Sequence, residues 1–404
     1  MSARPEAGNA DSIASTSPTS STTHSNTQSA APKSATTPAG PALTRYDGLD
    51  VIRIIAATVV VVAHCFDLTG HTASKPGFHV GQHYMVLFGR LGVYVFFVIS
   101  GFLIAASWER DPHAFAFLRR RVTRIFPALL VVVLLTVCVV GPIASSKSVG
   151  EYFTSRQTLQ YGLRNSTMLL GMEHHLPGVF VNHPNGSVNG SLWTLPYELW
   201  AYVLVMALGV IGLLRRTAFV LLALGAAVWV FHYGVVLQRF QLNQSLFGIT
   251  ERDGLELGML FLVGVLLARL RHRVDVRVFA VPGIVAIVSA LLLNAPLLFL
   301  LGLGVATIGV GAFGGRVARG IRRFGDPSYG MYICSYPIQQ ALFASRVART
   351  PVSMFLLSFP LSVAIAYASW HFVESPAIRL GRRRKRKDAA RGSAGSLVLQ
   401  EAAA

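Results

Sequence analysis

Strongly apolar stretches recur along this 404-residue chain, separated by short polar connections. A helix that crosses ~30 Å of hydrocarbon needs about 20 predominantly apolar residues. We expect ten spans, at 50–68, 88–107, 124–144, 193–213, 216–233, 255–270, 277–293, 296–313, 328–345 and 353–373. The ranges that begin at 255 and 296 are short or interrupted by glycine, so nine or eleven spans are the alternatives. The pattern predicts an all-α, polytopic integral membrane protein with about ten transmembrane helices.

Cationic residues are dense in every second connection between these ranges. The dense connections lie around 110–124, 215–216, 269–277 and 316–323, and the basic run RRRKRK occupies 382–387. Cytoplasmic connections of membrane proteins carry such an excess of Lys and Arg. The bias predicts a membrane protein with both termini in the cytoplasm. It also explains the net charge of +18 by contact with anionic lipid and without nucleic acid.

Composition separates the membrane part from two tails. Over the whole chain 52% of residues are hydrophobic and only 13% are charged, about half the charged fraction of an ordinary soluble protein. Residues 1–44 are rich in Ser and Thr and almost free of large aliphatic side chains, so they are predicted to form a disordered cytoplasmic tail. Residues 45–380 are predicted to form the transmembrane domain, and 381–404 a basic cytoplasmic tail.

Two ionisable side chains, Arg53 and His64, lie inside the first apolar range. Such residues are costly within a membrane and indicate a functional site. At ~1.5 Å per residue they lie roughly 16 Å apart, near opposite membrane faces. Asp67 follows on the same helical face as His64, and Glu198 is predicted at a similar depth. Either carboxylate could orient a histidine that acts as a general base, although packing or a structural ion pair is the alternative for each.

A basic run at 119–124 (RRRVTR) lies at the end of the membrane part where Arg53 enters. Guanidinium groups suit phosphate recognition because they stay charged and present planar donors. A nucleotide-bearing donor such as a coenzyme A thioester would find counter-charges there, although simple anchoring to the cytoplasmic leaflet also explains the run. Glu374 returns a carboxylate to this end, where Arg53 or the arginines of the third range could pair with it.

Small and aromatic residues interrupt two of the apolar ranges. Ser100 and Gly101 remove bulk from the second range, which favours close helix packing and also offers a hydroxyl. Tyr329 and Tyr332 share one face of the ninth range. Pro337 lies in the middle of that range, where it frees a backbone group that must line a cavity or find another partner.

Six segments of the chain, in this order, resemble the membrane acyltransferase-3 family: YDGLDVIRIIAATVVVVAH, FFVISGFLI, RRVTRIFP, SLWTLPYELWAY, SYGMYICSYP and FVESP. This family includes bacterial O-antigen and polysaccharide O-acetyltransferases and rhizobial nodulation-factor acetylases. The resemblance covers about residues 45–380. It implies about ten transmembrane helices and the transfer of an acyl group, usually acetyl from acetyl-CoA, to a sugar hydroxyl.

The resemblance also assigns roles to residues of this chain. It implies that His64 is the catalytic histidine with Arg53 as its partner, and we add Glu198 and Asp67 to the catalytic set. The residues expected to bind the acyl donor are Ser100, Arg121, Arg124, Tyr329 and Tyr332. The expected partners are acetyl-CoA and a glycan or glycolipid acceptor, without a metal. Ser335 stands where relatives often have histidine, so acceptor choice is expected to differ here.

The expected mechanism places donor and acceptor at opposite membrane faces. Acyl-CoA enters from the cytoplasm, and His64 removes the proton from a sugar hydroxyl that attacks the thioester. A covalent acyl-histidine stays open as a variant. The alternative function is a proton-coupled transporter or exporter that uses the buried Arg53, His64 and Glu198. The absence of an internal sequence repeat and the one-sided basic cluster favour the enzyme.

Overall fold

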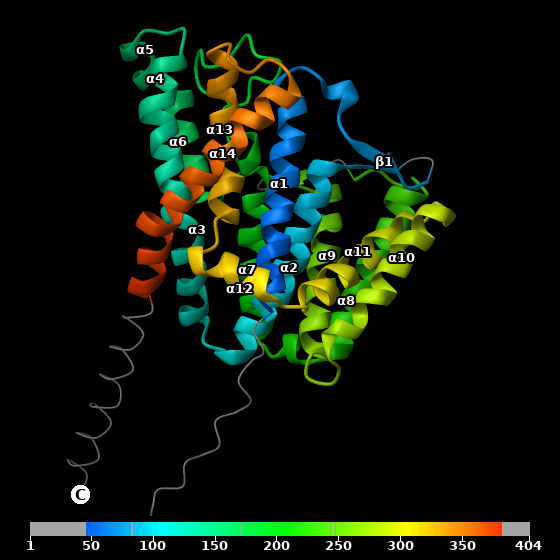
Figure 1. Ribbon diagram of the computed structural model, residues 1–404. Helices are drawn as coiled ribbons and strands as arrows, with labels where there is room; N and C mark the ends of the chain where they lie inside the picture. The colour runs from blue at the N-terminus through cyan, green and yellow to red at the C-terminus, as the bar shows by residue number, and fades with distance from the viewer. Residues whose placement is uncertain (1–45, 82–83, 170, 243, 247, 382–404) are drawn as a thin grey trace, which may run out of the picture. The chain divides into compact units, whose positions relative to one another are not determined.

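The computed structural model describes residues 46–81, 84–169, 171–242, 244–246 and 248–381. This part of the chain is almost entirely helical (Figure 1). The helices are α1 Gly48–Leu68, α2 Phe88–Arg110, α3 Ala114–Leu135, α4 Gly141–Ala144, α5 Val149–Thr154, α6 Arg156–Thr167, α7 Leu195–Val210, α8 Thr217–Phe231, α9 Glu251–Leu270, α10 Ala280–Leu293, α11 Pro296–Gly311, α12 Arg316–Phe324, α13 Ser328–Ala344 and α14 Pro351–Ser369. The predicted tails lie outside the described residues, except for Gly381.

The strands of the described ranges form two short antiparallel pairs. They are β1 Gly77–His79 with β2 Met85–Leu87, and β3 Ser245–Leu246 with β4 Ile249–Thr250. The first pair lies between α1 and α2, and the second leads into α9. The class predicted from the sequence, an all-α membrane protein, is therefore confirmed.

Each of the ten predicted ranges coincides with a helix, but fewer helices meet the requirements for crossing a membrane. Within the described ranges, seven helical segments are long and apolar enough: Gly48–Leu68, Phe88–Arg110, Ala114–Ala144, Gly190–Val210, Thr217–Val236, Val276–Leu293 and Pro351–Gly381. Helix α9 begins with four charged residues among its first six, and α11 and α13 have only 16 and 17 residues. The structure therefore supports seven spans by this measure, and not the predicted count of about ten.

Helix α2 forms the centre of the helical packing. It contacts α1, α7, α9 and α11, and its close approach to α9 depends on glycine. A Cβ added at Gly101 would collide with the carbonyl oxygen of Phe261, and one added at Gly264 would collide with that of Val98. This contact confirms the close packing predicted for the small residues of the second range.

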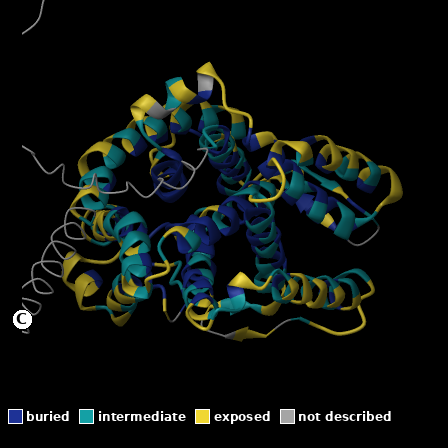
Figure 2. Cartoon of the chain, turned by 90° about the horizontal axis from the view of Figure 1, so that it is seen from below, coloured by how far each residue is buried: buried dark blue, intermediate teal, exposed yellow. Residues whose placement is uncertain are grey.

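Large apolar side chains cover the outward faces of the peripheral helices. Leu222, Val281, Leu292 and Leu356 are all exposed, on α8, α10 and α14. Figure 2 shows buried positions on faces turned towards other helices and exposed positions on the outward faces. A soluble protein would not leave so much apolar surface uncovered, whereas lipid covers it without cost.

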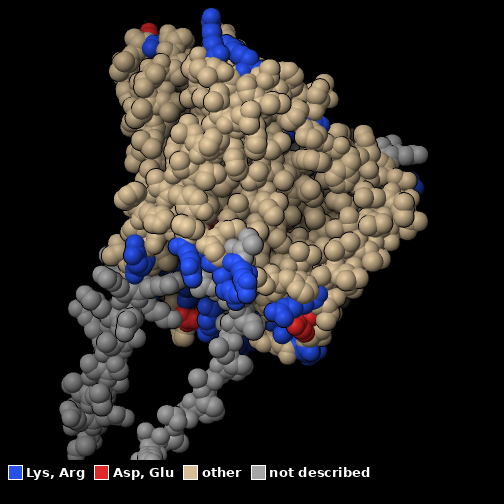
Figure 3. Space-filling model, viewed as in Figure 1, with Lys and Arg blue, Asp and Glu red and all other residues tan. Residues whose placement is uncertain are grey.

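Most Lys and Arg side chains on the face drawn in Figure 3 lie at its lower end, which we call the basic end; a few lie at its upper end, and a wide band almost without charged residues lies between them. Some cationic side chains are ion-paired within the protein, since Arg269 and Arg271 pair with Glu109 at 2.6 and 2.8 Å. An uncharged band bordered by cations is the surface expected of a membrane protein.

The segment between α6 and α7 is fastened to α13. The Asn189 side-chain amide donates to the carbonyl oxygen of Ile333 over 2.9 Å. That oxygen lacks its usual helical partner because Pro337, four residues on, has no N–H. Gln340 adds bonds of 2.7 and 2.5 Å to the carbonyl oxygens of Asn185 and Ser187. The predicted need for a partner beside Pro337 is therefore met by this segment.

Candidate functional site

A small cavity between α1, α2, α3, α7 and α13 brings together most of the predicted site. We call it the arginine cavity; its volume is about 110 Å³. The predicted residues that line it are Arg53, Ser100, Arg121, Arg124, Glu198, Tyr329 and Tyr332. They come from five helices that are far apart in the sequence. Glu198 therefore lies with the arginines of this cavity and not beside His64, where its predicted depth placed it.

Asp326 joins two of the cavity's arginines. Its Oδ2 atom lies 2.6 Å from Arg53 Nη1 and 2.6 Å from Arg124 Nη2. Arg124 also reaches the fully buried carboxylate of Glu374, at 2.8 Å, as predicted for the third-range arginines. Two guanidinium groups are therefore matched by two carboxylates, which is the condition for keeping charges in a low-dielectric interior.

The sequence analysis missed Asp326. Its other oxygen, Oδ1, accepts hydrogen bonds from the backbone N–H and hydroxyl of Ser328 at the start of α13. Burial alone would raise the pKa of Asp326, but Arg53 and Arg124 outweigh burial and hold that pKa well below its usual range. An Asp-Pro-Ser sequence immediately before an apolar helix was the signal available, because it is typical of a capped helix start.

Arg121 differs from its neighbours. It forms no ion pair with any described carboxylate, and its guanidinium carbon lies 5.6 and 5.7 Å from the ring centroids of Phe117 and Tyr202. The Tyr202 hydroxyl donates a short hydrogen bond to Glu198, one helical turn before it. Arg124 also lies over two aromatic rings, but it is ion-paired as well, whereas Arg121 is held by aromatic faces without a direct ion pair and can still pair with an anionic ligand.

A second cavity adjoins the arginine cavity at the basic end of the molecule. This entrance cavity has a volume of about 600 Å³, and its walls include Arg110, Arg119 and Arg120. It shares Leu103, Arg121 and Arg124 with the arginine cavity. A phosphate-bearing ligand could therefore contact several guanidinium groups before it reaches the arginine cavity.

A third cavity holds His64. This histidine cavity has a volume of about 320 Å³ and shares Val93 and Tyr332 with the arginine cavity. Arg53 and His64 therefore line two adjoining cavities, as their separation along α1 predicted. The three cavities follow one another in the order entrance, arginine, histidine.

The imidazole of His64 is held by packing. Its ring meets the Tyr336 ring edge to face, with centroids 4.9 Å apart and an interplanar angle of 75°. Its Nδ1 atom is buried and has no hydrogen-bond partner among the described residues. A buried ring nitrogen without a partner can accept a proton from a bound hydroxyl.

Neither predicted carboxylate bonds to His64. Asp67 lines the histidine cavity, but both of its oxygens are taken by Lys75, at 2.6 and 2.8 Å. Glu198 lines the arginine cavity and is bonded to Tyr202. The expectation that one of them orients the imidazole is therefore not met by these contacts. Lys75, which follows α1 in the chain, pairs with Asp67, and the position of Glu198 on α7 places its carboxylate in the arginine cavity.

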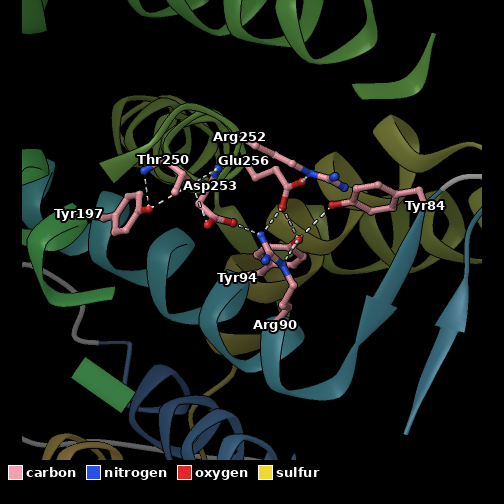
Figure 4. A network of polar contacts seen from close by, with 8 residues as sticks. All are labelled: Tyr84, Arg90, Tyr94, Tyr197, Thr250, Arg252, Asp253 and Glu256. Atoms are coloured by element: carbon pink, nitrogen blue, oxygen red, sulfur yellow. Dashed lines mark hydrogen bonds and ion pairs between the residues drawn. The ribbon is translucent and has the colours of Figure 1, made fainter. Parts of the chain in front are cut away.

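Arg90 is a further cavity residue that the sequence analysis did not single out. It lines the histidine cavity and reaches across to α9, where its Nη2 atom lies 2.8 Å from Glu256 (Figure 4). Glu256 is only 1% exposed, and it also accepts from the Tyr94 hydroxyl at 2.6 Å and pairs with Arg252 at 3.2 Å. This network fixes the guanidinium of Arg90 at the cavity wall. The available signal was a pair of acids, Asp253 and Glu256, one turn apart at the start of an apolar helix.

Comparison with known proteins places most of the chain in one family. A family described as an acyltransferase domain, of the acyltransferase-3 type, matches residues 46–371. An O-acetyl transferase of Shigella phage Sf6 is 28% identical over 342 residues, which are 80% of this chain and 94% of that protein. Nodulation protein 10 of Rhizobium leguminosarum bv. viciae is 26% identical over 356 residues, or 83% and 94% of the two chains. No solved structure matches the chain significantly.

Proposed function

Since the chain belongs to the acyltransferase-3 family, we propose that this membrane-bound acyltransferase moves an acetyl group from cytoplasmic acetyl-CoA to a hydroxyl of a cell-envelope or exported glycan. The observation that carries the proposal is the order of the three cavities. Guanidinium groups line the entrance and arginine cavities, and the adjoining cavity holds His64. Donor phosphates and the reacting hydroxyl would then approach from opposite ends. The name of one relative, the O-acetyl transferase of Shigella phage Sf6, agrees with this activity.

The donor fits the basic end of the site. The phosphates of acetyl-CoA would contact the guanidinium groups of the entrance cavity, where planar charged donors suit phosphate oxygens. Arg121 is the best candidate at the inner end, because Arg53 and Arg124 are already matched by Asp326 and Glu374. The narrow arginine cavity would then hold the extended pantetheine arm, beside Ser100, Tyr329 and Tyr332.

The chemical step takes place where the arginine and histidine cavities meet. His64 accepts the proton of the acceptor hydroxyl, whose oxygen forms a bond to the thioester carbonyl carbon. The carbon–sulfur bond then breaks, and the proton passes from His64 to the departing thiolate. The products are the acetyl ester and free coenzyme A, so atoms and charges balance without a further reactant. An acetyl-histidine intermediate is the variant that this geometry also permits.

The proposed topology follows from the same arrangement. The basic end drawn in Figure 3 faces the cytoplasm, and the histidine cavity opens to the opposite side of a bacterial inner membrane. Both chain termini are then cytoplasmic. The segment between α6 and α7 lies on the side from which the acceptor arrives.

The experiment that tests this function uses sealed vesicles containing the purified protein in one orientation. Acetyl-CoA is supplied on one side and glycan from the envelope of cells lacking this gene on the other, and mass spectrometry detects the acetyl ester. We expect transfer only when the donor is on the basic side, with a loss of about 10²–10⁴-fold for His64→Ala. His79→Ala, at an exposed position in β1, serves as the matched control. Transfer by His64→Ala at the wild-type rate, or with the donor on either side, contradicts the proposal.

A further inference from the structure

Three residues of the histidine cavity carry buried polar atoms without a hydrogen-bond partner in the described part of the chain. The atoms are Nδ1 of His64, Nδ1 of His174 and the hydroxyl oxygen of Tyr336. The Tyr336 hydroxyl lies close to the Ser187 side chain, and the His174 ring lies close to the Asn189 backbone. Buried polar atoms are nearly always paired in folded proteins. These groups of one cavity therefore have hydrogen-bonding capacity to offer a ligand that brings its own donors and acceptors.

An aromatic surface lies in the same cavity. Trp193 lines it, and the guanidinium carbon of Arg90 lies 5.9 Å from the Trp193 ring centroid. Ligand sites typically combine an apolar or aromatic wall with a few placed polar groups. A pyranose ring has the matching chemistry, because its C–H groups form an apolar face while its hydroxyls radiate from the edge.

The residues of this cavity are held in place by contacts outside it. His174 and Trp193 belong to the segment that Asn189 and Gln340 fasten to α13. Tyr336 lies on α13 itself, and its ring packs against Gly190, where an added Cβ would come within 2.7 Å of it. The wall formed by the segment and the wall formed by α13 are therefore fixed relative to each other. A preformed arrangement of this kind reduces the ordering cost of binding.

We infer that the histidine cavity is the subsite for one sugar ring of the acceptor, with Trp193 against the ring face and Tyr336 and His174 bonded to its hydroxyls. The inference rests on the proposed function and specifies its acceptor. The reacting hydroxyl faces His64, and the two neighbouring hydroxyls set the orientation of the ring. The volume of about 320 Å³ is at the lower end for ligand pockets, which suits a single ring and leaves the rest of a glycan outside.

The test measures apparent KM values for acceptor and donor separately. The acceptor is glycan extracted from the envelope of cells lacking this gene, and the donor is acetyl-CoA. Tyr336→Phe and His174→Gln each remove or alter one hydrogen-bonding group, so the acceptor KM should rise about threefold to tenfold while the donor KM stays unchanged. Trp193→Ala should raise the acceptor KM more than Trp193→Phe, which keeps a ring and guards against simple unfolding. Tyr233→Phe is the matched control, since Tyr233 lines none of the three cavities.

Two results would overturn the inference in different ways. If the wild-type protein acetylates the glycan and all three cavity variants keep the wild-type acceptor KM, the sugar binds elsewhere. If cyclohexanol, which has a hydroxyl but no neighbouring ones, is acetylated as efficiently as glycan, the cavity does not read a sugar. If the wild-type protein transfers acetyl to no acceptor, the proposed function itself fails, and the two failures are thus distinguishable.

Discussion

The side-chain amide of Asn189 occupies the carbonyl oxygen of Ile333 that Pro337 leaves without its helical partner. This single bond of 2.9 Å joins the segment carrying His174 to the helix carrying Tyr336. Asn189 is itself 1% exposed, so the bond is shielded from water. The proline and the asparagine, 148 positions apart, therefore act together in forming the histidine cavity.

Asn189→Ala should loosen this cavity without affecting the donor. The Ile333 oxygen would be left unpaired, which costs about 1–3 kcal/mol. We expect a lower unfolding temperature in detergent and a higher KM for the acceptor glycan. Gln157→Ala is the control, because Gln157 bonds to His175 in the same segment through an exposed contact. Equal effects of the two changes would show that the Asn189 bond has no special role.

Among single substitutions of the arginines that line the arginine cavity, Arg121→Gln should cause the largest loss of donor binding through lost charge. Arg121 forms no direct ion pair with a described carboxylate, although the charge of Glu198 acts on it from a greater distance, so its guanidinium can still pair with a phosphate. Loss of a charged hydrogen bond should raise the acetyl-CoA KM about tenfold to a hundredfold, with the acceptor KM unchanged. Isothermal titration with coenzyme A provides an independent readout. Arg215→Gln, at an exposed position outside the three cavities, should bind coenzyme A normally; a normal KM for Arg121→Gln would contradict the assignment.

Asp326→Asn should destabilise the fold strongly. It leaves the guanidinium groups of Arg53 and Arg124 without the carboxylate they share. The side chains of this bridge are 16–20% exposed, so the cost should lie between that of a surface pair and the ~3–5 kcal/mol of a fully buried one. Asp275→Asn, at an exposed and distant pair with Arg277, should cost well under 1 kcal/mol, as surface pairs do (~0–1 kcal/mol). Denaturation in detergent measures both. Similar costs for the two variants would argue against the buried bridge.

The same bridge has a predictable pH dependence. The pKa of Asp326 is lowered in the folded protein, so its stabilisation is fully present above the ordinary value of 3.8. It is lost only as pH falls below that value towards the folded pKa. The wild-type minus Asp326→Asn difference in unfolding free energy should therefore stay constant between pH 7 and about 5. A difference that grows as the pH falls across that range would indicate a carboxylate with a raised pKa, and a difference that does not decrease below the ordinary value would indicate an unshifted pKa.

His174 gives a dependence of the same sign in a higher pH range. Burial, and then the neighbouring His175, lower the pKa of His174. The unfolded segment therefore binds a proton more readily than the folded one, and stability falls as pH drops below the ordinary value of 6.5. Hydrogen exchange of residues 171–190, corrected for intrinsic rates, should show less protection at pH 5.5 than at pH 7.5. His174→Gln should remove this difference; if it persists in the variant, another group is responsible.

The sequence predicted the positions of the helices better than the pairing of the polar side chains between them. Apolar run length determines where a helix can lie in a membrane, and the separation of Arg53 and His64 follows from helical rise alone. Pairing is different, because it depends on neighbours brought together by the fold. Asp67 lies one turn from His64 but is taken by Lys75, and Arg90 meets Glu256 from 166 positions away. Neither ion pair could be predicted from the spacing of residues on one helix.

Tyr332 belongs to the walls of both the arginine and the histidine cavities, and its hydroxyl is 2.6 Å from that of Thr194. In the proposed topology this ring separates two water-accessible spaces that face opposite sides of an energised membrane. It must therefore act as an electrical and proton seal, since an enzyme with an open passage would dissipate the cell's ion gradients. Vesicles containing Tyr332→Ala should leak protons, as reported by an entrapped pH-sensitive dye, whereas Tyr332→Phe vesicles should stay tight. Tight vesicles with the alanine variant would locate the seal elsewhere. The same ring also limits where catalysis can take place, because the thioester and the hydroxyl can meet only beside Tyr332, where the two cavities adjoin.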